Sequence, residues 1–134
     1  GRVEGLIPGL VHVAFAYDSI TRLLEQYGRM KDMGEKPVVA VNHGPTISLY
    51  YKDPDRNTLE LFVDRFPTVE QCNEFMANEI FSSNPVGYDI DPDAMLSRLR
   101  EGAPEEELLQ YDEELGRSVN VEQLAQRHMG LMSC

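Results

Sequence analysis

The side chains considered first for acid-base chemistry or metal binding are His12, His43, Tyr50 and Glu60, which lie on or beside apolar runs of the sequence. Glu60 is the most conspicuous, because a single carboxylate interrupts the apolar run TLELF. Imidazole, phenol and carboxylate groups gathered on one surface could line a concave site. Whether they meet depends on the strands that carry them.

The first strand is predicted at residues 10–17, LVHVAFAY, where side chains alternate between two faces. One face carries Val11, Val13, Phe15 and Tyr17, and the other carries His12, Ala14 and Ala16. The alternation therefore predicts a strand whose second face holds a histidine among small residues.

Three more strands are predicted at 37–43, 46–52 and 57–63, separated by HGP and by the turn DPDRN. In the last strand Leu59, Leu61 and Val63 share one face, and Glu60 shares the other with Phe62. In the strand before it, the apolar set is Ile47, Leu49 and Tyr51, opposite Thr46, Ser48 and Tyr50. If the apolar sets pack beneath a helix, the side chains that emerge together on the other face are His12, Ser48, Tyr50 and Glu60.

That helix is predicted after the first strand. Asp18 or Ser19 can cap it, and Gly34 is placed to end it. Its apolar positions at helical spacing are Ile20, Leu23, Leu24, Tyr27 and Met30. The predicted order is β-α-β-β-β, an α+β fold consisting of one βαβββ module.

The pattern becomes helical after Phe66. Thr68 and Gln71 form a capping box before an apolar stripe of Val69, Cys72, Phe75, Met76 and Ile80. Asp91 and Pro92 start a helix containing Met95, Leu96 and Leu99 and ending at Gly102, and a second box lies at Asn120 and Gln123. We therefore divide the chain into a linker-like start (1–9), the βαβββ module (10–66) and a helical C-terminal extension (67–134).

Composition limits the function classes. The 134 residues, 42% hydrophobic, suffice for one core, and the net charge of −11 opposes binding to nucleic acid or anionic membrane. Without an eighteen-residue apolar run or a secretory signal, a cytoplasmic location is expected. Cys72 and Cys134 show no CxxC spacing and are predicted to be free thiols. The acidic run PEEELLQYDEEL predicts a solvated helix or a loose tail.

Each candidate residue also has a purely structural interpretation. His12 could be a hydrogen-bonded structural group, Glu60 could face water, and Tyr50 could make ordinary cross-strand packing. His43 lies in a loop beside glycine and proline, where a histidine needs no role. His128, near a predicted helix end, is expected to interact with the helix dipole rather than with a metal.

The segments GLVHVAF and VNHGPTISLYYKDPDRNTLELFVD resemble the second βαβββ module of the vicinal oxygen chelate superfamily, in particular its type I extradiol dioxygenases and their short relatives. The resemblance covers roughly residues 6–90. The stretch FPTVEQCNEFMANEIFSSNPVGYDIDPDAML is also similar to the extension that follows this module in the short relatives.

The resemblance implies an oxidoreductase of aromatic compound catabolism, which cleaves a catechol-type ring with dioxygen at a mononuclear Fe(II), with Mn(II) or another divalent metal as alternatives. By matching position, His12 and Glu60 would be metal ligands. His43 would match a histidine that assists proton movement near bound oxygen. Tyr50 would match the tyrosine that hydrogen-bonds the metal-bound substrate.

Two departures from the family leave alternatives open. The family's other histidine ligand comes from a preceding module, so we expect a second βαβββ module from a preceding segment, a partner chain or a homodimer, completing a paired-module cup. Self-pairing would supply two histidines and two carboxylates, closer to the glyoxalase branch. A glyoxalase-type isomerase or lyase and a non-catalytic small-molecule-binding module are therefore the alternative functions.

The second departure is Arg56, where relatives usually have glycine. A positive φ at Arg56 would cost about 1 kcal/mol or more. We therefore expect Asn57 to absorb the turn instead.

Overall fold

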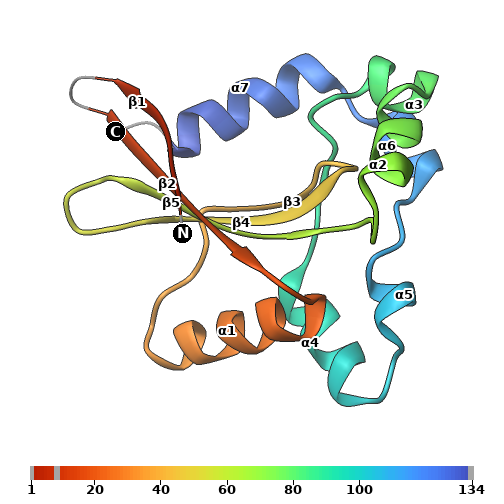
Figure 1. Ribbon diagram of the computed structural model, residues 1–134. Coiled ribbons are helices and arrows are strands. Elements are labelled where there is room, and N and C mark those ends of the chain that lie inside the picture. The colour runs from red at the N-terminus through yellow and green to blue at the C-terminus, as the bar shows by residue number, and fades with distance from the viewer. Residues whose placement is uncertain (1, 8–9, 133–134) are drawn as a thin grey trace.

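A mixed sheet forms the centre of the computed structural model, which describes residues 2–7 and 10–132, with side chains from residue 13 onward (Figure 1). Within these residues the sheet has six strands in the order β1-β2-β5-β4-β3-β6. Strands β2 and β5 run parallel, and every other neighbouring pair is antiparallel. The strands are β1 (Arg2–Ile7), β2 (Leu10–Tyr17), β3 (Val39–Asn42), β4 (Thr46–Lys52), β5 (Thr58–Asp64) and β6 (Tyr88–Asp89).

The predicted β-α-β-β-β order is confirmed, as β2, α1 (Ile20–Asp32), β3, β4 and β5. Ser19, not Asp18, caps α1, since its side chain accepts a hydrogen bond from the backbone N–H of Arg22. The chain leaves the helix at Gly34, whose φ of 85° suits glycine. Alternation and helical spacing therefore located the central module correctly.

Helices cover both faces of the sheet (Figure 1). On one face α1 packs with α4 (Pro92–Arg100) and α5 (Glu105–Leu108), and on the other lies α7 (Val121–Met132). Near one end of the sheet lie α2 (Val69–Met76), α3 (Glu79–Ser83) and α6 (Glu113–Ser118). Asn120 caps α7 and Thr68 caps α2, as predicted.

The main core lies between the sheet and α1. It contains most of the apolar residues predicted for the helix and for one face of the strands. From the helix these are Ile20, Leu23, Leu24 and Tyr27, and from the strands they are Ile47, Leu49, Tyr51, Leu61 and Val63. Met95, Leu96 and Leu108 of the extension complete it. Burial of this side of the sheet fixes the strand parity, because a one-residue slip would turn every apolar side chain outward.

Several expectations need correction. The segment 1–9, expected to be a linker, contains β1, which pairs antiparallel with β2. The extension is not purely helical, since β6 adds to the edge of the sheet beside β3. The apolar stripe predicted for α2 is only partly covered, with Val69 72% and Met76 39% exposed.

The turn between β4 and β5 differs from the expectation as well. Arg56, not Asn57, adopts the positive φ, at 67°. Asp53 compensates: its carboxylate accepts hydrogen bonds from the backbone N–H groups of Asp55 and Asn57, and its carbonyl accepts one from Arg56. These bonds lower the pKa of the Asp53 carboxyl. A compact Asp-centred turn therefore outweighs the strain at Arg56.

The cysteine and charge predictions are covered in part. Cys72 is a free thiol, and Cys134 lies outside the described residues. The acidic stretch is divided between α5 and α6, where its carboxylates are exposed while Leu108 is buried. In the part of the chain that the structure describes, no helix has both the length and the apolar character needed to cross a membrane.

Candidate functional site

The sheet face opposite α1 carries Glu60 among strand neighbours that the register fixes. Glu60 on β5 lies opposite Tyr50 on β4 and opposite Ala14 on β2. The Ser48 hydroxyl donates a hydrogen bond to Glu60 Oε2 at 2.9 Å. Glu60 is half-buried rather than fully solvated, and its role as a metal ligand stays a prediction.

His12 lies on β2, the strand that pairs in parallel with β5. The register places position 12 opposite Thr58, which is two residues before Glu60. The side chain of His12 lies outside the described residues, so its role as a ligand stays a prediction.

His43 follows β3 and is joined to Tyr50. His43 Nε2 lies 2.9 Å from the Tyr50 hydroxyl, and Nδ1 lies 2.7 Å from the Val86 carbonyl oxygen. A carbonyl only accepts, so Nδ1 carries the proton; in a neutral ring Nε2 then accepts from the Tyr50 hydroxyl. His43 is therefore held by two partners, and its role stays a prediction.

Burial tunes this histidine. It lowers the pKa of His43 because desolvation disfavours the imidazolium form, against weaker opposing effects of the Val86 carbonyl and the Glu60 charge. In the neutral ring the lone pair of Nε2 is available as an acceptor, although the lowered pKa makes the ring a weaker base than a free imidazole. The arrangement can therefore hold a proton between the Tyr50 oxygen and His43.

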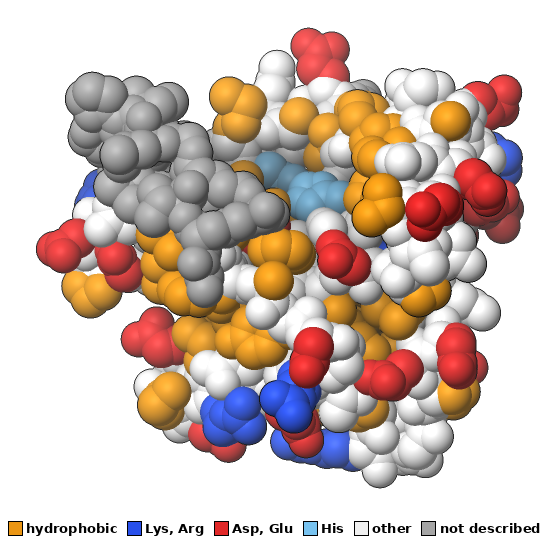
Figure 2. Space-filling model, in the orientation of Figure 1, with side chains coloured by type: hydrophobic (Ala, Val, Ile, Leu, Met, Phe, Trp, Pro, Cys, Tyr) orange, Lys and Arg blue, Asp and Glu red, His pale blue; other side chains and the backbone are white. Residues whose placement is uncertain are grey.

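Part of this face is covered by α7, which was not expected. Met132 packs against the buried cluster of Val39, Val41 and Tyr50. His128 of α7 is 4% exposed, and its Nε2 lies 2.8 Å from Asp89 Oδ1. Figure 2 shows histidine side chains at the centre of one face of the molecule, with hydrophobic side chains around them.

The expected interaction of His128 with the helix dipole stays a prediction, and the side chain has a specific partner in Asp89. Burial lowers the pKa of His128, as does the nearby Arg127. Asp89 receives hydrogen bonds from both Arg127 and His128. Asp89 lies opposite Val41 in the sheet, so the pair attaches α7 to the face that carries Tyr50.

The donor set fits a metal only in part. Among the side chains that the structure describes, no three histidine, cysteine or carboxylate groups come together as a metal site. Glu60 offers a carboxylate aligned by Ser48, and His12 occupies the neighbouring strand position. A facial Fe(II) site takes two histidines and one carboxylate, so the described residues by themselves do not complete such a site.

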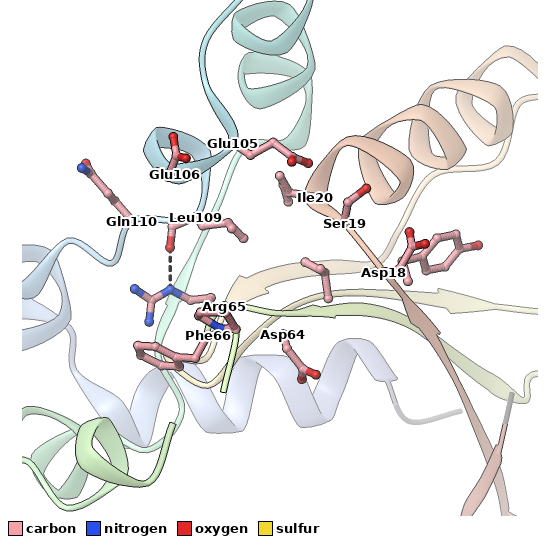
Figure 3. A pocket seen from close by; sticks show the side chains of 13 residues that line it. Asp18, Ser19, Ile20, Asp64, Arg65, Phe66, Glu105, Glu106, Leu109 and Gln110 are labelled. Atoms are coloured by element: carbon pink, nitrogen blue, oxygen red, sulfur yellow. Dashed lines mark hydrogen bonds between the residues drawn. The ribbon is translucent and has the colours of Figure 1, made fainter. Parts of the chain in front are cut away.

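A hollow of about 610 Å³ lies elsewhere on the molecule (Figure 3). It is bordered by Ser19 at the start of α1, by Asp64 and Arg65 at the end of β5, and by Glu105 and Leu109 of the extension. Glu60, Tyr50 and His43 do not line it. This hollow is therefore separate from the candidate metal site.

Sequence reasoning missed the contacts that hold His43 in place. Val86 supplies the carbonyl that fixes its tautomer, and it lies 43 positions away in the extension. Neither residue belongs to a motif, and the chain must fold before the two meet. Only the proline and glycine on either side of Val86 hinted at a turn there.

The fold and this face together give one βαβββ module that carries a carboxylate and a histidine-phenol pair on the side opposite its helix. Two curated relatives, both from Rhodococcus globerulus, are similar to the chain. Biphenyl-2,3-diol 1,2-dioxygenase 3 is 39% identical over 100 residues, which make up 75% of this chain and 53% of the relative. Biphenyl-2,3-diol 1,2-dioxygenase 2 is 38% identical over 96 residues, 72% of this chain and 50% of the relative.

These relatives confirm the predicted resemblance to extradiol dioxygenases of the vicinal oxygen chelate superfamily. The chain spans about half the length of the curated relatives it matches. No family model matches the chain. No solved structure gives a significant match either.

Proposed function

We propose that this chain is the metal-binding half of an extradiol dioxygenase that cleaves a catechol-like aromatic diol in the cytoplasm. One observation carries the proposal: Glu60, Ser48, Tyr50 and His43 are joined by short hydrogen bonds in two pairs on the sheet face opposite α1. The names of the two relatives support the reaction class. In the proposal, His12 and Glu60 hold Fe(II) or, less favoured, Mn(II).

The third ligand is proposed to be a histidine of a second βαβββ module, from a preceding segment, a partner chain or a second copy. A ferrous ion, when bound, supplies the redox chemistry that lets dioxygen react with the diol. Glu60 contributes negative charge, and Ser48 holds one of its oxygens. Partial burial of a carboxylate costs free energy unless its charge is compensated, and a bound metal cation would compensate it.

His43 and Tyr50 are proposed to manage protons and to orient the diol. The neutral His43 ring can accept a proton at Nε2, and its Nδ1–H is fixed by the Val86 carbonyl. The Tyr50 hydroxyl, 2.9 Å from Nε2, can exchange that partner for a substrate oxygen. General acid-base assistance of this kind contributes about 100- to 10,000-fold in rate.

Metal content of the complete polypeptide containing these residues, purified without oxygen, tests the proposal. We expect near-stoichiometric iron in the wild type, loss of iron in Glu60→Ala, and oxygen uptake with catechols only when iron is present. Glu70→Ala is the matched control, because Glu70 lies exposed on α2. Iron retained by Glu60→Ala would refute the ligand role of Glu60, and iron-loaded protein without oxygen uptake would refute the dioxygenase.

A further inference from the structure

We propose that Arg65 is the positioning residue that fixes the His43 turn to the strand carrying Glu60. The expected effect of Arg65 on kcat rests on the proposed function, whereas its placement of the His43 turn does not. Arg65 is the first residue after β5, five positions beyond Glu60. A side chain at this point can therefore hold another segment in a fixed position relative to Glu60.

Arg65 donates twice to the turn that follows His43. Its backbone N–H donates to the Pro45 carbonyl at 3.0 Å, and Nη1 donates to the Gly44 carbonyl at 2.6 Å. These carbonyls belong to the two residues directly after His43. Two donors from one residue restrain both the position and the tilt of the turn.

The guanidinium group also reaches the extension. Its Nε donates to the Leu109 carbonyl at 2.6 Å, the bond drawn in Figure 3 beside the 610 Å³ hollow. Because Nε and Nη1 point in fixed directions, the planar group spans Gly44 and Leu109 at once. A single Lys ammonium on a flexible stem lacks that fork.

Aromatic rings enclose the cation. The guanidinium carbon lies 4.8 Å from the centre of the Phe66 ring and 5.5 Å from those of Phe75 and Tyr111. Burial lowers the pKa of Arg65 because it disfavours the charged form. The hydrogen bonds and ring contacts of the guanidinium offset the free-energy cost of removing it from water.

The turn itself has little freedom, which makes its anchor effective. Gly44 has a φ of 99°, and a Cβ there would lie 2.4 Å from a ring carbon of Phe75. The Gly44 N–H donates to Asn42 Oδ1 at 2.9 Å. His43 is therefore held between Asn42 and an anchored Gly44, in the position from which Nε2 meets Tyr50.

Arg65→Lys and Arg65→Met in the complete polypeptide test this role, with Arg117→Met as control, since Arg117 is exposed on α6. In metal-free protein, the imidazole ¹⁵N NMR signals of His43 report its bonds to Val86 and Tyr50 without any catalysis. We expect both Arg65 variants to move these signals, and Arg117→Met to leave them unchanged.

In iron-loaded protein assayed with catechol, both Arg65 variants should lower kcat about 10- to 100-fold, with iron content and KM near wild type. Wild-type His43 signals and kcat in a folded Arg65→Lys would overturn the proposal. If Arg65→Met fails to fold, Arg65→Lys decides. Unfolding of both variants would overturn it too, because Arg65 would then be a general structural residue. A wild type without oxygen uptake would refute the proposed function instead, and the NMR signals would still decide the role of Arg65.

Discussion

Tyr50 and Tyr51 are neighbours in β4, yet their hydroxyl groups meet different surroundings. Tyr50 lies on the face of Glu60 and bonds His43 at 2.9 Å. Tyr51 packs in the main core, where its buried hydroxyl has no hydrogen-bond partner among the described residues. The two phenols therefore form a matched pair, one with a proposed function and one without.

We expect Tyr50→Phe to lower kcat about 100-fold, because the diol loses a hydrogen-bonding phenol and His43 loses its partner. Tyr51→Phe should leave kcat unchanged and raise the free energy of unfolding by about 1 kcal/mol, since it removes an unsatisfied buried hydroxyl. Steady-state oxygen uptake and urea unfolding measure the two effects. Equal kcat values for the two variants would contradict the proposed role of Tyr50.

The turn from β4 to β5 shows at the level of elements how hydrogen bonds offset backbone strain. Arg56 holds a φ of 67° because Asp53 binds the backbone on both sides of it. We expect Arg56→Gly to raise the free energy of unfolding by as much as about 1 kcal/mol, since glycine removes the left-handed strain but adds freedom to the unfolded chain.

Arg29→Gly is the matched control for that turn. Arg29 lies exposed within α1, so glycine there should destabilise the protein by about 1 kcal/mol. Urea unfolding with both variants gives the sign directly. Destabilisation of similar size in both would show that Arg56 is not strained.

The sequence predicted those elements that carry a long, regular pattern. Alternation gave β2, β4 and β5, and with them the shared face of Ser48, Tyr50 and Glu60. It did not predict β6, because two residues carry no periodicity, nor β1, because glycine and proline dominate its surroundings. The docking of α7 was also missed, since it depends on Asp89 and His128 meeting across 39 positions. Contacts between distant residues leave no local signal.

At the scale of the whole molecule, we expect the free energy of unfolding to depend on pH through two histidines that are withdrawn from water. The pKa values of His43 and His128 are both lowered, chiefly by burial. The groups that act on His43 are Glu60, Tyr50, the Val86 carbonyl and His128, and those that face His128 are Asp89 and Arg127. Below the ordinary histidine pKa of about 6.5, the unfolded chain binds protons that the folded chain refuses.

The sign of the effect follows from that difference in proton binding. The contribution of the histidines to the free energy of unfolding is fully present above about pH 6.5, and it is lost as the pH falls toward their lowered pKa values in the folded state. We expect the free energy of unfolding of metal-free protein to decrease between about pH 7.5 and pH 5.5. His128→Gln, which keeps an amide donor for Asp89, should make that decrease smaller. The carboxyl groups with lowered pKa, Asp53 and Asp93, act in the same direction only at lower pH, near and below their ordinary value of 3.8. Urea unfolding between about pH 7.5 and pH 5.5 therefore measures the effect of the histidines without that of Asp53 and Asp93. A free energy of unfolding that stays constant or rises toward pH 5.5 would contradict the neutral state of His43 in the folded protein.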